Sequence, residues 1–258
     1  MLDEVIMKKE EMRISHHGRE SYGVFCKPEK KDKYPIVIFS HGYNGSGIWA
    51  EPYAQYLTER GIGVFYHDFC GGSVHSKSSM KTTEMTLFTE EEDLLAVFNE
   101  ISTWSCTDKD NIFLWGESQG GLISAMAVNN LGSRVRGLIL VYPAFCIAND
   151  WRKKFPEISE IPEKVEFQGM TLGRKFFTSI HEFDAFQNIG CYKGKVLIIH
   201  GDKDPVVSFE YSRKAASRYQ NASLHILKEE GHGFTKEGKE KTLVLAYDMI
   251  RLDNSDLQ

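Results

Sequence analysis

Short runs of apolar residues alternate with helical stretches along most of this chain of 258 residues. Such runs are typical of strands that are buried on both faces of a sheet. They cover residues 36–39, 63–66, 112–115, 138–141 and 196–199. Parallel strands need long connections, and the intervening helices supply them. The pattern predicts an α/β fold, a mostly parallel, doubly wound sheet with helices on both faces.

The ends of the expected elements carry weaker signals. Alternating stretches at residues 12–15 and 21–26 predict an antiparallel entry to the sheet, and residues 224–227 a last strand. The expected helices cover residues 52–60, 89–104, 121–131, 209–219 and 235–250. We expect the second helix to open with the capping-box pattern Thr89-Glu90-Glu91-Glu92.

One connection is too long for a crossover. About fifty residues separate the run at 138–141 from the run at 196–199. The stretch is rich in aromatic residues, namely Trp151, Phe155, Phe167, Phe176, Phe177, Phe183 and Phe186. We expect residues 144–193 to form a lid inserted in a single domain that spans residues 1–258. Most of its aromatic side chains should pack together, and a minority should face a cleft.

Bulk composition excludes several classes of function. The formal net charge of -5 provides no basic surface for nucleic acid. No apolar stretch approaches the length of a membrane span, and the acidic start at residues 1–4 is unlike a secretory signal. The five cysteines are scattered, without C-x-x-C spacing, so neither a zinc site nor a disulfide framework is indicated. We expect a cytoplasmic protein without metal or organic cofactor, and we leave a homodimer open.

The segment Gly116-Glu117-Ser118-Gln119-Gly120 follows an apolar run and precedes a helical stretch. A serine at such a strand-to-helix turn is typical of a nucleophile elbow, with the glycines relieving crowding in the turn. The G-x-S-x-G pattern alone is weak, because many matches are ordinary turns. The interpretation therefore depends on partners elsewhere in the chain. We take Glu117, at the variable position, to be structural.

Two later motifs supply those partners. Asp202 and Asp204 follow the strand at 196–199, where a carboxylate lies on the ligand side of an open sheet. Either could instead cap the helix that starts near Ser208. His232 lies between two glycines after the last strand. The order serine, aspartate, histidine is that of α/β-hydrolases, so we predict a triad of Ser118, an aspartate and His232.

These residue types suit acyl transfer. The histidine can take the serine proton and return it to the leaving group, while the carboxylate holds the imidazole in the required tautomer. The developing oxyanion needs N–H donors, and we expect the backbone N–H groups of Gln119 and Tyr43 to serve. We expect His41, beside Tyr43, to brace this loop. A small-molecule ester is the expected partner.

These motifs resemble the α/β-hydrolase superfamily over essentially the whole chain. Within it, the chain is similar to bacterial cinnamoyl and feruloyl esterases, on the segments His41-Gly42-Tyr43, Gly116 to Gly121, His200 to Asp204, Gly231-His232 and the lid stretch from Ile161 to Gly173. The resemblance implies Asp204 as the triad acid and leaves Asp202 a structural or capping role. It also implies that Asp150 meets the phenolic end of an aromatic acyl group. Some relatives carry tyrosine where this chain has Phe176, so discrimination among hydroxycinnamates should be looser.

The leading hypothesis is a serine carboxylesterase that forms an acyl-enzyme and prefers hydroxycinnamate (feruloyl or cinnamoyl) esters. A monoacylglycerol lipase or acyl-thioesterase is the nearest alternative. A peptidase of the prolyl-oligopeptidase type shares this catalytic domain, but the chain has no room for the usual propeller. Dehalogenases use an aspartate at the elbow, where this chain has Ser118. A non-catalytic binding module usually lacks a triad member, and here all three are present.

Overall fold

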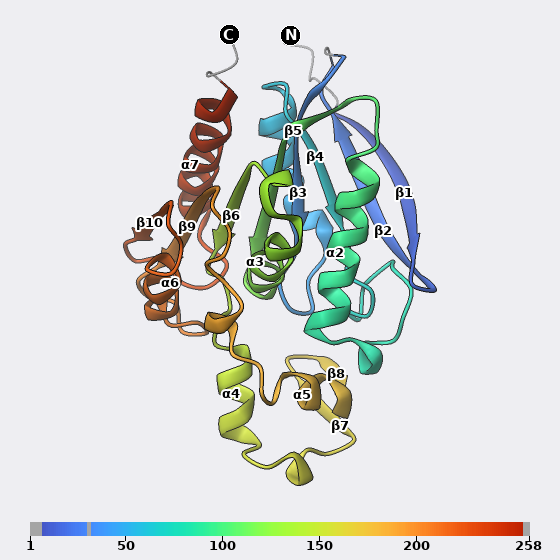
Figure 1. Cartoon of the computed structure of the whole chain (residues 1–258), viewed down its shortest axis with the longest axis vertical. Helices are drawn as coiled ribbons and strands as arrows, with labels where there is room; N and C mark the ends of the chain where they lie inside the picture. The colour runs from blue at the N-terminus through green and yellow to red at the C-terminus, as the bar shows by residue number, and fades with distance from the viewer. Residues whose placement is uncertain (1–6, 30–31, 255–258) are drawn as a thin grey trace.

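The computed structural model describes residues 7–29 and 32–254, so the acidic start at residues 1–4 lies outside the described residues. An eight-stranded sheet runs through the molecule in the order β1-β2-β4-β3-β5-β6-β9-β10 (Figure 1). Its strands are β1 (Lys8–His16), β2 (Arg19–Lys27), β3 (Tyr34–Ser40), β4 (Gly63–His67), β5 (Thr107–Glu117), β6 (Gly137–Val141), β9 (Lys195–Gly201) and β10 (Ala222–Leu227). β1 and β2 pair antiparallel, β2 pairs antiparallel with β4, and the remaining pairs are parallel. The expected mostly parallel sheet with an antiparallel entry is confirmed.

Period-two alternation explains why the central strands are apolar throughout. Ile36 and Ile38 of β3 join one core cluster, and Val37 and Phe39 join the other. The first cluster includes side chains of α2 (Leu87–Ile101), α3 (Gln119–Leu131) and α6 (Phe209–Ala216). The second includes side chains of α1 (Glu51–Thr58) and α7 (Lys236–Asn254). Both faces of the sheet are therefore covered.

The start of α2 differs from the sequence expectation. The helix begins at Leu87, with Thr86 as its N-cap. The Thr86 hydroxyl accepts from the Thr89 N–H at 3.1 Å, and the Thr89 hydroxyl accepts from the Thr86 N–H at 2.9 Å. The prediction that the capping box begins at Thr89 is therefore wrong. The box begins one turn earlier, at Thr86, and Thr89 is its third helical residue, the position where a glutamate was expected.

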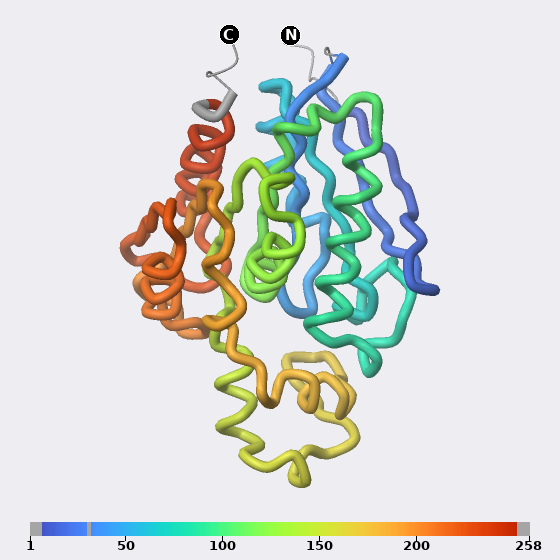
Figure 2. Tube along the Cα trace, viewed as in Figure 1, coloured from blue at the N-terminus to red at the C-terminus, as the bar shows by residue number. Residues whose placement is uncertain are grey.

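The long connection between β6 and β9 has secondary structure of its own. It contains α4 (Ile147–Lys154), β7 (Lys164–Phe167), β8 (Met170–Gly173) and α5 (Arg174–Ile180), with β7 and β8 paired as an antiparallel hairpin. Figures 1 and 2 show these elements, in yellow, beyond the end of the sheet. The Trp151 ring lies 4.7 Å from that of Phe177 and 5.0 Å from that of Phe167, so the aromatic side chains pack on one another. We call residues 144–193 of this connection the lid.

Among the described residues, no helix combines the length and the hydropathy that crossing a bilayer requires.

Candidate active site

Ser118 occupies the sharp turn between β5 and α3. Its backbone has φ 52° and ψ -117°, a conformation that is strained for a residue with a side chain. The chain can make this turn only because Gly116 and Gly120, on either side of Ser118, have no side chain. A Cβ on Gly116 would lie 2.2 Å from the Gly120 carbonyl oxygen, and one on Gly120 would lie 2.3 Å from the carbonyl oxygen of Ser40. Local sequence therefore places the serine hydroxyl at the carboxyl end of the sheet.

The predicted partners meet this hydroxyl, although they come from distant parts of the chain. His232 Nε2 lies 3.0 Å from Ser118 Oγ, and His232 Nδ1 lies 2.7 Å from Asp204 Oδ2. Asp204 follows β9, and His232 follows β10, so both lie at the same sheet edge as the elbow. The Asp204 side chain is fully buried, whereas that of His232 is 21% exposed toward the site.

The surroundings of Asp204 keep it ionised. Its Oδ1 accepts from the backbone N–H groups of Val206 at 2.8 Å and Val207 at 2.9 Å. Burial by itself would raise the pKa of Asp204, but hydrogen bonds from His200, His232 and Val207 together hold it well below its usual range. An ionised carboxylate orders the Nδ1–H tautomer of His232 and leaves Nε2 free to accept the serine proton.

His200 is a positioning residue that sequence reasoning passed over. Its Nε2 lies 2.9 Å from the Val207 carbonyl oxygen and 3.2 Å from Asp204 Oδ2, and its Nδ1 lies 2.7 Å from Ser212 Oγ. Because Nε2 faces two acceptors, it carries the proton and donates toward Asp204. The signal available in the sequence was a histidine at the end of an apolar run, directly before the aspartate pair.

The two candidate aspartates, Asp202 and Asp204, contact different partners. Asp202 Oδ1 accepts from the Glu229 N–H at 2.7 Å and so ties the loops after β9 and β10 together. It does not cap α6, because the Ser208 side chain caps that helix. Asp204 is the one of the pair that contacts His232, at 2.7 Å.

The expected oxyanion donors lie beside the serine. A Cβ added to Gly42 would be 3.0 Å from Ser118 Cβ, so the loop after β3 runs directly against the nucleophile. Within the described part of the chain, neither the Tyr43 N–H nor the Gln119 N–H forms a backbone-to-backbone hydrogen bond outside the helices and strands. N–H groups near a serine hydroxyl can stabilise a developing oxyanion, so Tyr43 and Gln119 stay the predicted donors.

His41 and Glu90 form hydrogen bonds with residues next to these two donors. The Phe69 N–H donates to His41 Nε2 at 3.0 Å, and His41 Nδ1 lies 2.7 Å from the Gly42 carbonyl oxygen. Burial lowers the pKa of His41, so the ring is neutral and braces the loop as expected. On the other side, the Gln119 side chain donates to Glu90 Oε2 at 2.7 Å. Burial raises the pKa of Glu90 to about 8.

A cavity of about 770 Å³ opens around Ser118 and extends under the lid. Trp151, Phe167 and Phe176 line it, while the remaining aromatic residues of the lid do not. Phe176 is buried. Asp150 also lines the cavity, but its side chain is half exposed and forms an ion pair of 3.5 Å with Lys153. Asp150 therefore lies at the outer end of the cavity.

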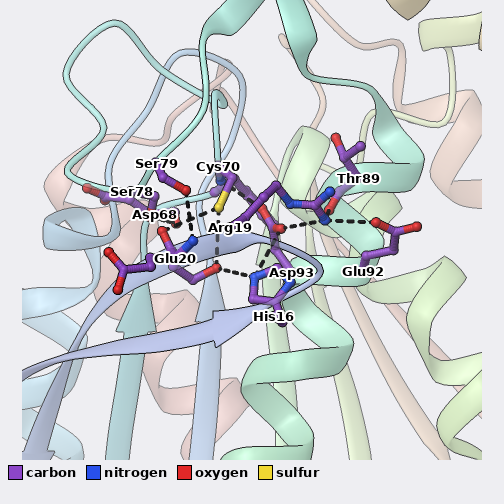
Figure 3. A network of polar contacts seen from close by, with 12 residues as sticks. His16, Arg19, Glu20, Asp68, Cys70, Ser78, Ser79, Thr89, Glu92 and Asp93 are labelled. Carbon is purple, nitrogen blue, oxygen red and sulfur yellow. Dashed lines mark hydrogen bonds and ion pairs between the residues drawn. The ribbon is translucent and has the colours of Figure 1, made fainter.

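One polar cluster away from this site resembles a metal centre in composition. The ligand atoms of His16, Cys70 and Asp93 lie within 4.8 Å of one another (Figure 3). However, the Arg19 guanidinium lies 3.2 Å from Asp93 Oδ1 and already supplies the positive charge there. Burial raises the pKa of Cys70 to about 12, so its thiol stays protonated. The cluster ties the β1–β2 hairpin to α2, and we do not assign it a metal.

Solved structures share this architecture. The structure of Est1E from Butyrivibrio proteoclasticus with bound ferulic acid has a TM-score of 0.84 and 25% identity, covering 93% of this chain and 98% of that one. DcsB in complex with its substrate analogue has a TM-score of 0.81 and 17% identity, covering 95% of this chain and 100% of that one. The second similarity concerns the fold alone. Fold and comparisons together define an esterase-like α/β-hydrolase.

The sequence comparisons identify the family of the chain within this class. The family profile described as "Prolyl oligopeptidase family" matches residues 50–247, and the chain belongs to that family. A 1-acylglycerol-3-phosphate O-acyltransferase, ABHD5 of Sus scrofa, is 30% identical over 141 residues, which are 54% of this chain and 37% of that protein. A 31.7 kDa protein from the traX-finO intergenic region of Escherichia coli is 30% identical over 114 residues, 43% of this chain and 38% of that protein. The matches thus span less than two fifths of either relative.

Proposed function

We propose that the protein is a serine carboxylesterase that acts on small carboxylic esters through an acyl-enzyme. The observation that carries the proposal is the continuous chain of contacts from Asp204 through His232 to Ser118. In the first step His232 removes the Ser118 proton as the oxygen attacks the ester carbonyl. The N–H groups of Tyr43 and Gln119 receive the oxyanion, and His232 then protonates the leaving alcohol. Water repeats the sequence on the acyl-enzyme.

We propose an aromatic, hydroxycinnamate-type acid as the preferred acyl group. The aromatic wall of Trp151, Phe167 and Phe176 supports this, because flat rings pack well against such a surface. The similarity to Est1E, whose structure holds ferulic acid, supports it as well. The position of Asp150 at the outer end of the cavity is compatible with a contact to a phenolic hydroxyl. Phe176 has no hydroxyl group that could bind a phenolic substituent, so the site should accept several ring substitution patterns.

The test has two arms. A fluorophosphonate probe should label the wild-type protein, and Ser118→Ala should abolish labelling and lower kcat by about 10⁶. Retention of most activity in this variant would refute the nucleophile. Methyl ferulate and a series of p-nitrophenyl acyl esters then address the acyl group. Strong activity on long acyl chains with none on aryl esters would favour the lipase or thioesterase alternative.

Peptide hydrolysis is the second candidate, because the family is named for an oligopeptidase. The same assay panel should include prolyl and alanyl p-nitroanilides. Cleavage of these amides at rates comparable to the esters would move the assignment to a peptidase. We expect the esters to be strongly preferred.

A further inference from the structure

Part of the cavity around Ser118 is lined by residues outside the lid. There it is lined by Trp49 and Tyr53 near the start of α1, by Glu117 at the end of β5, by Tyr142 after β6, and by Lys239 of α7. Trp49 is half exposed, so this region reaches the protein surface. Nothing in the acyl pocket explains why a glutamate and two tyrosines gather here.

Two polar atoms of this group lack partners. The Tyr142 hydroxyl donates to Glu117 Oε2 at 2.9 Å. Glu117 Oε1 and the Tyr53 hydroxyl are buried, and neither has a hydrogen-bond partner in the described part of the chain. Burial raises the pKa of the Tyr53 phenol, and the charge of Glu117 and a side-chain contact with it raise that pKa further, so the two groups lie close to each other. Buried polar atoms of this kind are costly unless a ligand or water completes them.

The group adjoins the catalytic histidine. The Tyr142 ring lies 4.6 Å from the His232 ring, and its hydroxyl reaches Glu117. In the proposed reaction His232 returns its proton to the leaving oxygen, so the alcohol departs on this side. In the proposed function the acyl group lies under the lid, which the Tyr43 hydroxyl joins to the loop after β3 by donating to the Phe167 carbonyl oxygen at 2.9 Å.

We propose that Tyr53, Glu117 and Tyr142 form a subsite for the alcohol portion of the ester, and that this alcohol carries further hydroxyl groups, as glyceryl and sugar esters do. Glu117 Oε1 accepts from one such hydroxyl, and the Tyr53 hydroxyl pairs with the same or a neighbouring one. The inference rests on the proposed esterase function and specifies its substrate class. The acid is selected by the lid, whereas the alcohol is selected by Glu117 and Tyr53.

The experiment compares two esters of one acid, methyl cinnamate and 2,3-dihydroxypropyl cinnamate. Wild type should show kcat/KM about tenfold higher for the dihydroxypropyl ester, as one or two buried hydrogen bonds provide. Tyr53→Phe and Glu117→Gln should bring this ratio toward one, and Glu117→Gln keeps an acceptor for Tyr142. Tyr56→Phe removes a hydroxyl from the same helix outside the cavity and should leave the ratio unchanged.

A second measurement needs no variant. Glycerol and ethanol, added at equal hydroxyl concentration, compete with water for the acyl-enzyme, and glycerol should capture several-fold more of it. A wild-type ratio near one, equal capture by both alcohols, or a ratio that neither variant changes would overturn the subsite while leaving the esterase in place. A preference for a choline ester over the dihydroxypropyl ester would also overturn it, in favour of a cation site. Failure of wild type to hydrolyse either ester or to react with the fluorophosphonate would overturn the proposed function itself.

Discussion

Asp204→Asn tests the catalytic geometry most directly, because both carboxylate oxygens face only donors. Oδ2 faces the ring nitrogens of His232 at 2.7 Å and His200 at 3.2 Å. Oδ1 faces the N–H groups of Val206 and Val207. An amide NH₂ placed on either side therefore meets a donor. This donor–donor clash is removed most easily if the His232 proton moves from Nδ1 to Nε2. Nε2 then presents a proton to Ser118 and has no lone pair to accept the serine proton.

The expected loss is correspondingly large. An amide in place of a triad aspartate costs about 10⁴ in turnover in other serine hydrolases, which is roughly 5–6 kcal/mol of transition-state stabilisation. The buried NH₂ without an acceptor should lower the free energy of unfolding by only about 1–3 kcal/mol. Hydrolysis of methyl cinnamate and urea denaturation, measured on the same preparation, separate the two effects.

Asp202→Asn is the matched control two residues away. It weakens the hydrogen bond to the Glu229 N–H and leaves the contacts of His232 intact, so activity should stay within about tenfold of wild type. The reasoning fails if Asp204→Asn also stays within tenfold, or if Asp202→Asn is the more severe variant.

Two further predictions concern stability. Gly120→Ala should lower the free energy of unfolding by more than about 3 kcal/mol, because its Cβ would lie 2.3 Å from the Ser40 carbonyl oxygen; Gly231→Ala, with no neighbour closer than 3.8 Å, should cost far less in the same urea titration. Glu90 has a folded pKa of about 8, above its unfolded value, so its contribution to stability is present at low pH and is lost as pH rises toward 8. Glu90→Gln should remove this loss, which is on the order of a few kcal/mol, and flatten the dependence of the free energy of unfolding between pH 5 and pH 8. An unchanged pH dependence would show that Glu90 is ionised in the folded protein.

Much of the fold could be predicted because its signals are local. The apolar runs at β3, β4, β5, β6 and β9 coincide with the observed strands, since burial on both faces of a sheet requires apolar residues at every position. The helix after the elbow was expected from Gly121 and begins at Gln119. The lid was harder. Its α4, β7, β8 and α5 were not predicted, because short elements held together by aromatic packing show no clear periodicity.

The catalytic candidates could be named for a similar reason. Glycine spacing around Ser118 and His232 reports on backbone strain and exposure, which are local properties. The order of the motifs along the chain then suggested their partnership. By contrast, the choice between Asp202 and Asp204 could not be made from the residues alone, because both follow the same strand and both can accept hydrogen bonds.

The sequence by itself determined a parallel α/β sheet, a serine at a strained turn and two polar loops at the same sheet edge. These features follow from periodicity and from glycine, which act over a few residues. Only the tertiary structure decided that His232 lies 3.0 Å from a serine 114 positions earlier in the chain. It also decided that Glu117, taken from sequence as structural, keeps one buried oxygen without a partner beside the cavity. Distances and missing partners depend on segments far apart in the chain, and no local pattern encodes them.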